Sequence, residues 1–133
     1  MNTVLTITLS VLIFGFLILS HEFGHYLAAR KCGVIVDEFS IGMGPLLAQK
    51  KKKGTFWSLR LLPLGGYCKM KGEDENDLSE GTFNAAKPIK RIIILLSGAL
   101  MNLLTAVLLF FAIYAIQGTD ATTTLAKVSE GSP

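Results

Sequence analysis

The chain has 133 residues, half of them hydrophobic, and a mean hydropathy of +0.49. This composition excludes an ordinary soluble domain of this size and indicates a membrane protein, with the lipid bilayer as a partner. The formal net charge is only +3, which gives no support to nucleic-acid binding. The two cysteines, Cys32 and Cys68, form neither a CxxC pair nor a disulfide framework.

The first predicted element is an apolar helix in residues 1–31. Between residues 4 and 19 the only polar or small residues are Thr6, Thr8, Ser10 and Gly15, and no helix breaker follows before Arg30. A helix over residues 4–30 would be about 40 Å long, more than the roughly 30 Å of a bilayer core. A signal peptide is the alternative, but no charged side chain precedes the run and no cleavage site ends it. We therefore predict a retained membrane-spanning helix.

The sequence His21-Glu22-Phe23-Gly24-His25 stands near the end of this helix. Residues at i and i+4 share a helix face, so His21 and His25 can converge on one Zn²⁺ ion, and Glu22 can act as general base. The alternative is a polar cluster at the membrane interface. Ionisable groups beside an apolar run are costly and usually functional, which favours the zinc site. Cys32 is close enough to be considered as a ligand, but we favour a free thiol.

Residues 32–87 are predicted to form a cytoplasmic segment built around a β-hairpin. Strand-like runs occur at residues 34–40 and 55–62, with the polar turn 50–54 between them. Apolar residues flank that turn, so the hairpin is expected to lie against the membrane or the helices. Residues 63–67 have the composition of a further turn, and residues 73–80 that of an exposed acidic loop.

The second membrane-spanning helix is predicted at residues 88–117. Pro88 suits a first helical turn and Gly118 a stop. Asn102 lies deep in this apolar run, with Gly98 one turn earlier on the same face. One interpretation is an amide that only joins two helices. The other is a close helix approach that directs Asn102 at the metal site.

Twelve of the thirteen Lys and Arg residues lie between Arg30 and Arg91. The positive-inside rule therefore predicts that residues 32–87 are cytoplasmic and that both ends lie outside. Residues 118–133 become polar and contain one short strand-like run at residues 125–128. The expected fold class is membrane α-helical, with two transmembrane helices and a membrane-associated hairpin on the cytoplasmic side between them.

Taken together, these motifs resemble the site-2 protease family of intramembrane zinc metalloproteases, most closely the bacterial regulator-of-sigma-E type. The resemblance covers nearly the whole chain. It rests on residues 21–26, Phe39-Ser40-Ile41-Gly42-Met43-Gly44-Pro45, residues 62–70, Phe83-Asn84, Arg91 and Ser97-Gly98-Ala99-Leu100-Met101-Asn102. Several motifs in the same order are far more specific than HExxH alone.

The resemblance implies that His21 and His25 are zinc ligands and Glu22 the catalytic base. It implies that Asn102 and Gly98 bind substrate or support the active site, although Ala99 stands where many members have Pro. The hairpin would be the family's membrane-associated β-loop, which presents substrate as an extended strand. The substrates would be single-pass membrane proteins, such as anti-sigma factors or signal-peptide remnants, in a bacterial plasma membrane.

Residues 118–133 resemble the start of the PDZ domain that such proteases carry on the outer face, so the chain is expected to be truncated before that domain and the later helices. Family members take a third zinc ligand, an Asp, from one of those helices. No Asp of this chain matches that motif, so we expect this piece to be inactive alone. The alternatives are a non-catalytic membrane module that binds a partner through the hairpin, and a membrane-anchored zincin of the soluble type.

Overall fold

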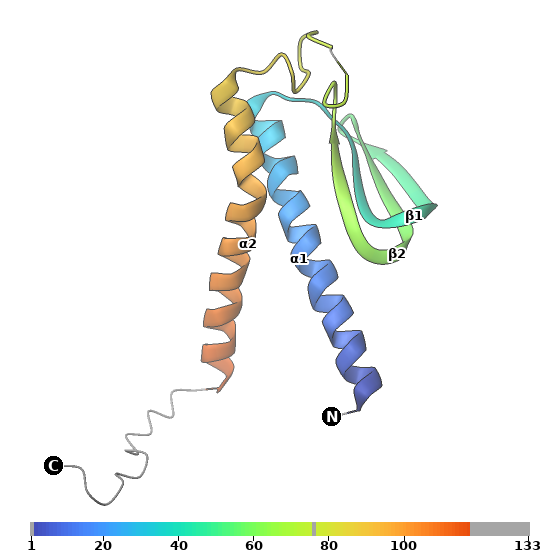
Figure 1. Cartoon of the computed structure of the whole chain (residues 1–133), viewed down its shortest axis with the longest axis vertical. Coiled ribbons are helices and arrows are strands. Elements are labelled where there is room, and N and C mark those ends of the chain that lie inside the picture. Colours follow the sequence, from blue (N-terminus) through green and yellow to red (C-terminus); the bar gives the residue numbers. More distant parts are fainter. Residues whose placement is uncertain (1, 76, 118–133) are drawn as a thin grey trace, which may run out of the picture.

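The computed structural model describes residues 2–75 and 77–117. The chain forms two long helices and one long β-hairpin, and the hairpin lies between the helices in the sequence (Figure 1). In chain order the elements are α1 (Thr3–Cys32), β1 (Val36–Lys52), β2 (Thr55–Met70) and α2 (Pro88–Gln117). The two helices and the hairpin between them are as predicted. Residues 118–133, interpreted above as the start of a PDZ domain, lie outside the described residues.

Both helices are long and apolar enough to cross a membrane. Most of their large apolar side chains face outward: Leu12 is 58% exposed and Phe110 is 62% exposed. A surface of this kind is stable only against lipid or another apolar partner. Helix α1 ends at Cys32 and is capped by Gly33, whose left-handed φ of 83° allows its N–H and that of Val34 to bond back to the last turn.

Helices α1 and α2 approach closely because glycine occupies the contact. A Cβ atom on Gly24 would collide with the carbonyl oxygen of Ser97 and lie 2.9 Å from the Cβ of Met101. One turn earlier on α1, the hydroxyls of Ser20 and Thr105 are 2.6 Å apart. Small residues and hydroxyl pairs of this kind are the usual means of packing helices inside a membrane.

The hairpin turns at two residues, Lys53 and Gly54, which have φ values of 52° and 87°. Two successive positive φ angles are the geometry of a tight hairpin turn. Both strands are longer than predicted. Residues 50–52 lie in β1, where they pair with residues 55–57 of β2, and were wrongly assigned to the turn. Residues 63–67 lie in β2 and were wrongly interpreted as a turn. Glycines with positive φ, including Gly42 and Gly65, let the strands bend and shift register without ending.

The long strands fold over, so that the first half of β1 has neighbours on both sides. Residues 38–41 pair antiparallel with 66–69, and they also pair with 56–59, where the numbers of both segments rise together. Residues 66–69 pair only with β1 within the described chain. They therefore form an edge of the sheet, and this edge lies beside α1.

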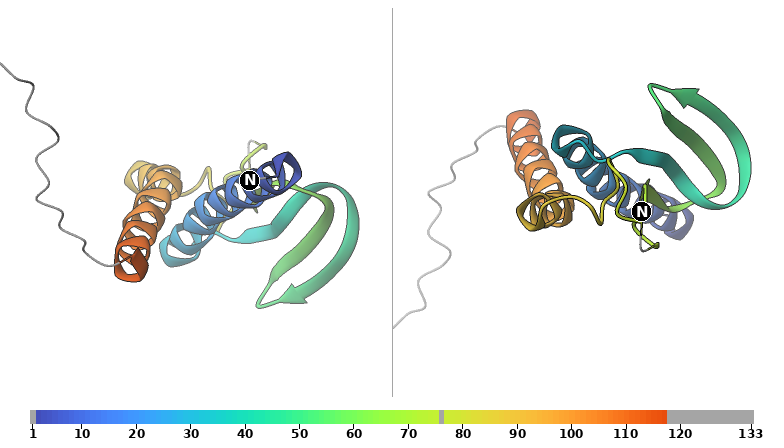
Figure 2. Two further views of the ribbon diagram at one scale, coloured as in Figure 1. Left: turned by 90° about the horizontal axis from the view of Figure 1, so that it is seen from below. Right: turned by 90° about the horizontal axis from the view of Figure 1, so that it is seen from above.

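Helix α1 lies between α2 and the hairpin, as the views along the helices show (Figure 2). The buried core is small and lies at one end of the molecule, where Ala29, Val36, Phe39 and Ile94 are at most 1% exposed. Tyr26, Trp57 and Phe39 add a cluster of ring contacts between α1 and the sheet. The far part of the hairpin is apolar and exposed, and its large side chains are Ile41, Met43, Leu46, Leu47, Leu59, Leu61, Leu62 and Leu64.

Arg60 forms a polar centre inside this apolar hairpin. Its guanidinium donates to Glu38 Oε1 at 3.1 Å, Tyr67 Oη at 2.7 Å, Ser40 Oγ at 3.1 Å and the carbonyl oxygen of Gly44 at 2.9 Å. Burial alone raises the pKa of Glu38, but hydrogen bonds from Ser58, Tyr67 and Arg60 outweigh it and hold that pKa below its ordinary 4.5. Arg60 therefore ties three bent segments of the hairpin together.

Candidate metal centre and the adjoining groove

His21 and His25 both lie on the face of α1 that contacts α2. They are half-buried, and their ring centroids are 4.8 Å apart with the planes nearly perpendicular. An added Cβ atom on Gly98 would lie 2.5 Å from His25 Nε2 and 2.6 Å from His21 Nε2. The two Nε2 atoms therefore point into one small space, which exists because residue 98 has no side chain.

A backbone carbonyl of α2 determines which ring nitrogen of His25 carries the proton. His25 Nδ1 lies 2.7 Å from the carbonyl oxygen of Ile94. A carbonyl can only accept a hydrogen bond, so Nδ1 of the neutral ring carries the proton and Nε2 keeps its lone pair. This is the usual arrangement of a metal-ligating histidine, in which the distal ring nitrogen donates to a backbone carbonyl or carboxylate.

These residues fit a zinc ion. Two neutral imidazole nitrogens converge on a space that a single methyl group would fill, and zinc binds such nitrogens at about 2.0–2.1 Å. The part of the chain that the structure describes contains no group of three or more His, Cys, Asp or Glu side chains placed to hold a metal ion. Cys32 follows His25 by seven residues, about 10 Å along the helix, and is a free thiol.

Asn102 approaches the same site from α2. Its Nδ2 atom lies 3.5 Å from His21 Nδ1, and its Oδ1 atom is buried without a hydrogen-bond partner among the described residues. Ile94, Gly98 and Asn102 follow one another at intervals of four along α2. This face therefore meets His25, the shared space and His21 in turn.

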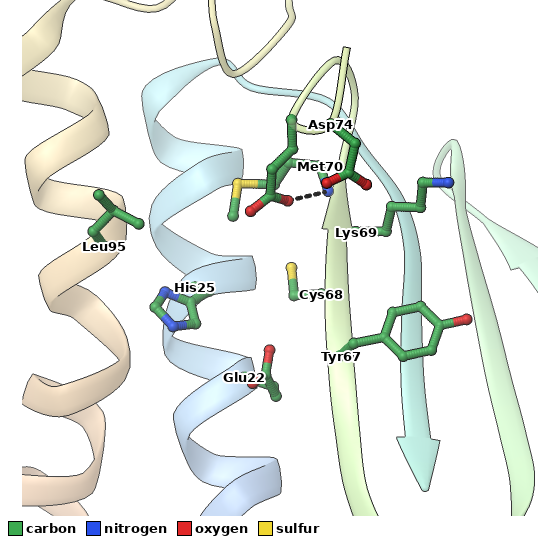
Figure 3. A pocket seen from close by; sticks show the side chains of 9 residues that line it. Glu22, His25, Tyr67, Cys68, Lys69, Met70, Asp74 and Leu95 are labelled. Carbon is green, nitrogen blue, oxygen red and sulfur yellow. Dashed lines mark hydrogen bonds between the residues drawn. The ribbon is translucent and has the colours of Figure 1, made fainter. Parts of the chain in front are cut away.

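Glu22 faces a groove of about 440 Å³ between the two helices and β2, which His25 also lines. Figure 3 shows Glu22 and Cys68 in the space between α1 and β2, with His25 beside them on the α1 wall. The groove is lined by Glu22, His25, Tyr67, Cys68, Lys69, Met70, Glu73, Asp74 and Leu95. The sheet edge at residues 66–69 thus forms one wall, directly opposite the carboxylate.

Cys68 faces this groove as a thiol. Burial raises its pKa to about 12, and the nearby carboxylates of Glu22 and Glu73 add to the rise. A thiol of this kind stays protonated at neutral pH and is a poor nucleophile. Sequence reasoning did not identify Cys68, Met70 or Glu73 as lining residues, because only the folded-over register brings them to α1.

The structure thus brings together the HExxH residues, Gly98 and Asn102, which come from two helices separated by residues 33–87. A helix-borne histidine pair with an adjacent glutamate is a pattern typical of zinc metalloproteases, and here it stands on a helix long and apolar enough to cross a membrane.

Comparison with known proteins identifies the family. Residues 9–132 match the model of "Peptidase family M50". Relatives named "Putative zinc metalloprotease" are 42% identical over 127 residues in Clostridium acetobutylicum (96% of this chain, 37% of the relative). The relative in Campylobacter jejuni is 44% identical over 109 residues, which cover 78% of this chain and 30% of the relative. The relative in Neisseria meningitidis serogroup A is 47% identical over 109 residues, which cover 77% of this chain and 24% of the relative. The chain belongs to peptidase family M50, whose cofactor is zinc, and to the site-2 protease group predicted from its motifs.

Proposed function

We propose that the chain is the N-terminal part of a zinc-dependent intramembrane endopeptidase that cleaves single-pass membrane proteins. The observation that carries this proposal is the convergence of His21 Nε2 and His25 Nε2 beside Gly98, with Glu22 next to them in a groove. The chain spans between about a fifth and two-fifths of the length of the curated relatives it matches. Activity, substrates and partners are therefore proposed for the longer parent protein.

In this proposal His21 and His25 hold the zinc ion through Nε2. When bound there, zinc supplies Lewis-acid polarisation of the scissile carbonyl. The Glu22 carboxylate takes a proton from the attacking water and later delivers it to the departing amine nitrogen. Ile94 keeps the His25 proton on Nδ1, and the packing of α1 against α2 leaves both histidines half-buried.

The substrate is proposed to lie along the edge of β2. Residues 66–69 have a neighbour on one side only within the described chain, and residues 67–69 line the groove that contains Glu22. An extended peptide that pairs with such an edge presents its backbone carbonyls at fixed intervals. A helical segment of a membrane protein would have to unwind to bind in this way, which would restrict cleavage to segments that unwind readily.

We further propose that the protein lies in a bacterial plasma membrane with both ends outside and residues 32–87 in the cytoplasm. The support is the concentration of twelve of thirteen Lys and Arg residues between the helices. The proposed division is residues 1–31, 32–87, 88–117 and 118–133, the last as the beginning of a PDZ domain. Substrates are anti-sigma factors or signal-peptide remnants.

The piece is proposed to be inactive by itself, because a catalytic zinc site needs three protein ligands and only two are assigned here. A non-catalytic module that binds a partner through the hairpin is the second candidate, and the exposed apolar hairpin favours it. The two candidates differ in what Glu22 does, since a binding module does not need a carboxylate beside the histidine pair.

The test compares the parent protein with its Glu22→Gln variant on a single-pass membrane substrate in reconstituted vesicles. We expect zinc content to be unchanged and cleavage to fall by a factor of at least about 10³, since the amide cannot accept the proton. A matched control is Glu73→Gln, which alters a carboxylate of the same groove at a position with no proposed proton transfer. Retained cleavage in Glu22→Gln would exclude the general-base role.

A further inference from the structure

The two histidines of the site differ in how their second ring nitrogen is held. His25 Nδ1 has a carbonyl acceptor at 2.7 Å, which fixes its proton. His21 Nδ1 has the Asn102 amide nitrogen at 3.5 Å, which is too long for a good hydrogen bond. The adjacent Asn102 Oδ1 is buried and lacks a partner among the described residues. An unpaired buried amide oxygen next to a ring nitrogen calls for a physical explanation.

The two possible contacts have opposite consequences for the metal site. If Asn102 Nδ2 donates to His21 Nδ1, the proton of the neutral ring must sit on Nε2. That proton would then point into the space beside Gly98 where His25 Nε2 also converges, and it would block ligation there. If Asn102 Oδ1 instead accepts from Nδ1–H, His21 Nε2 keeps its lone pair, as His25 Nε2 does.

Half a turn of the Asn102 amide about its last side-chain torsion exchanges the two atoms within the same volume. The exchange gives the buried carbonyl oxygen a donor, and the NH₂ group takes the position that the oxygen leaves. The backbone supports this assignment. Ile94 and Asn102 lie four residues before and after Gly98 on one face of α2. The backbone carbonyl oxygen of Ile94 would then hold the His25 ring, and the side-chain carbonyl oxygen of Asn102 would hold the His21 ring.

We propose that Asn102 is a positioning residue whose Oδ1 atom accepts a hydrogen bond from His21 Nδ1–H and so directs His21 Nε2 toward the metal space. This inference deepens the proposed function and rests on His21 being a zinc ligand. Asn102 acts through His21, because its amide lies beside Nδ1 and not beside Nε2, the nitrogen proposed to bind the metal. Losing a hydrogen bond of this kind typically lowers metal affinity about 10- to 100-fold.

The metal-free chain gives the most direct test. The sequence contains only two histidines, so ¹⁵N-histidine labelling yields two imidazole signals, and a His25→Asn variant assigns both. Spectra are recorded in detergent micelles under alkaline conditions. The ¹⁵N shifts then report which ring nitrogen carries the proton.

Three variants separate a positioning role from a structural one. Asn102→Leu removes the acceptor at similar volume, and we expect His21 to move to the Nε2–H form. Asn102→Asp supplies a carboxylate that can only accept, and we expect it to retain Nδ1–H. Thr105→Val removes the neighbouring contact to Ser20 between the same helices, and we expect no change in His21.

The same variants are titrated with Zn²⁺ alone. Asn102→Leu is expected to bind about 10- to 100-fold more weakly, with Asn102→Asp and Thr105→Val close to the unaltered chain. The proposal is overturned if His21 carries its proton on Nε2 in the unaltered chain or in Asn102→Asp, or if Asn102→Leu leaves the proton on Nδ1. Failure of the catalytic proposal is seen separately, as cleavage by the Glu22→Gln parent, because the proton measurement uses neither metal nor substrate.

Discussion

The sharpest prediction concerns Gly98→Ala, which adds one methyl group between the two histidines. Its Cβ would lie 2.5 Å from His25 Nε2, whereas ordinary Cβ contacts begin at 3.4 Å, so that nitrogen must recede by about 0.9 Å. Metal–ligand distances tolerate about 0.2 Å. The methyl also occupies the space on which the lone pairs converge. We expect Zn²⁺ affinity to fall by at least about 100-fold, beyond the usual effect of losing a supporting hydrogen bond.

The assay is Zn²⁺ titration of the parent protein, with the unfolding free energy measured in parallel. Overpacking of this kind costs about 1–3 kcal/mol, so the variant should remain folded. Ala99→Leu is the matched control, because it adds bulk to the adjacent and exposed position of α2. Zinc affinity of Gly98→Ala within about threefold of the unaltered protein would refute the convergence of both Nε2 atoms at this glycine.

Three further predictions concern the hairpin and the loop that follows it. Arg60→Met should lower the unfolding free energy, because Glu38, whose side chain is 18% exposed, loses its charged partner. Since the folded pKa of Glu38 is lowered, this difference is full above its ordinary value of 4.5 and disappears as the pH falls through the folded value. A maleimide should label Cys32 readily and Cys68 only after unfolding, because burial raises the pKa of the Cys68 thiol to about 12. Asn84→Ala should speed amide exchange in the loop after β2 about tenfold, since it removes two hydrogen bonds to loop carbonyls.

Each of these predictions has a control and a contrary result. Lys50→Met removes an exposed hairpin charge and should leave stability unchanged, so an equal loss would show that Arg60 acts by charge alone. Comparable labelling of both thiols in the folded protein would contradict the burial of Cys68. Ser79→Ala alters the same loop without removing the contacts of Asn84, and equal exchange in both variants would contradict the anchoring role of Asn84.

The sequence predicted the two helices well because their signals are local. A long apolar run predicts a long helix, and α2 (Pro88–Gln117) forms over the second apolar run. The hairpin was only half predicted. Its two-residue turn at Lys53 and Gly54 was located within the polar run, but the strands continue through residues that favour turns. Glycines allow either a turn or a bend, and only pairing across the sheet decides between them.

The candidate site shows the same division between local and distant information. The pair His21 and His25 is visible because the chemistry lies in the side chains and the spacing is that of a helix. On α2 the sequence indicated that Gly98 and Asn102 share a face, but it did not show that Ile94 contributes a backbone carbonyl or that Gly98 leaves room for two ring nitrogens. Residue type alone cannot report either contribution. A metal site between two helices therefore depends as much on what the second helix leaves out as on what the first supplies.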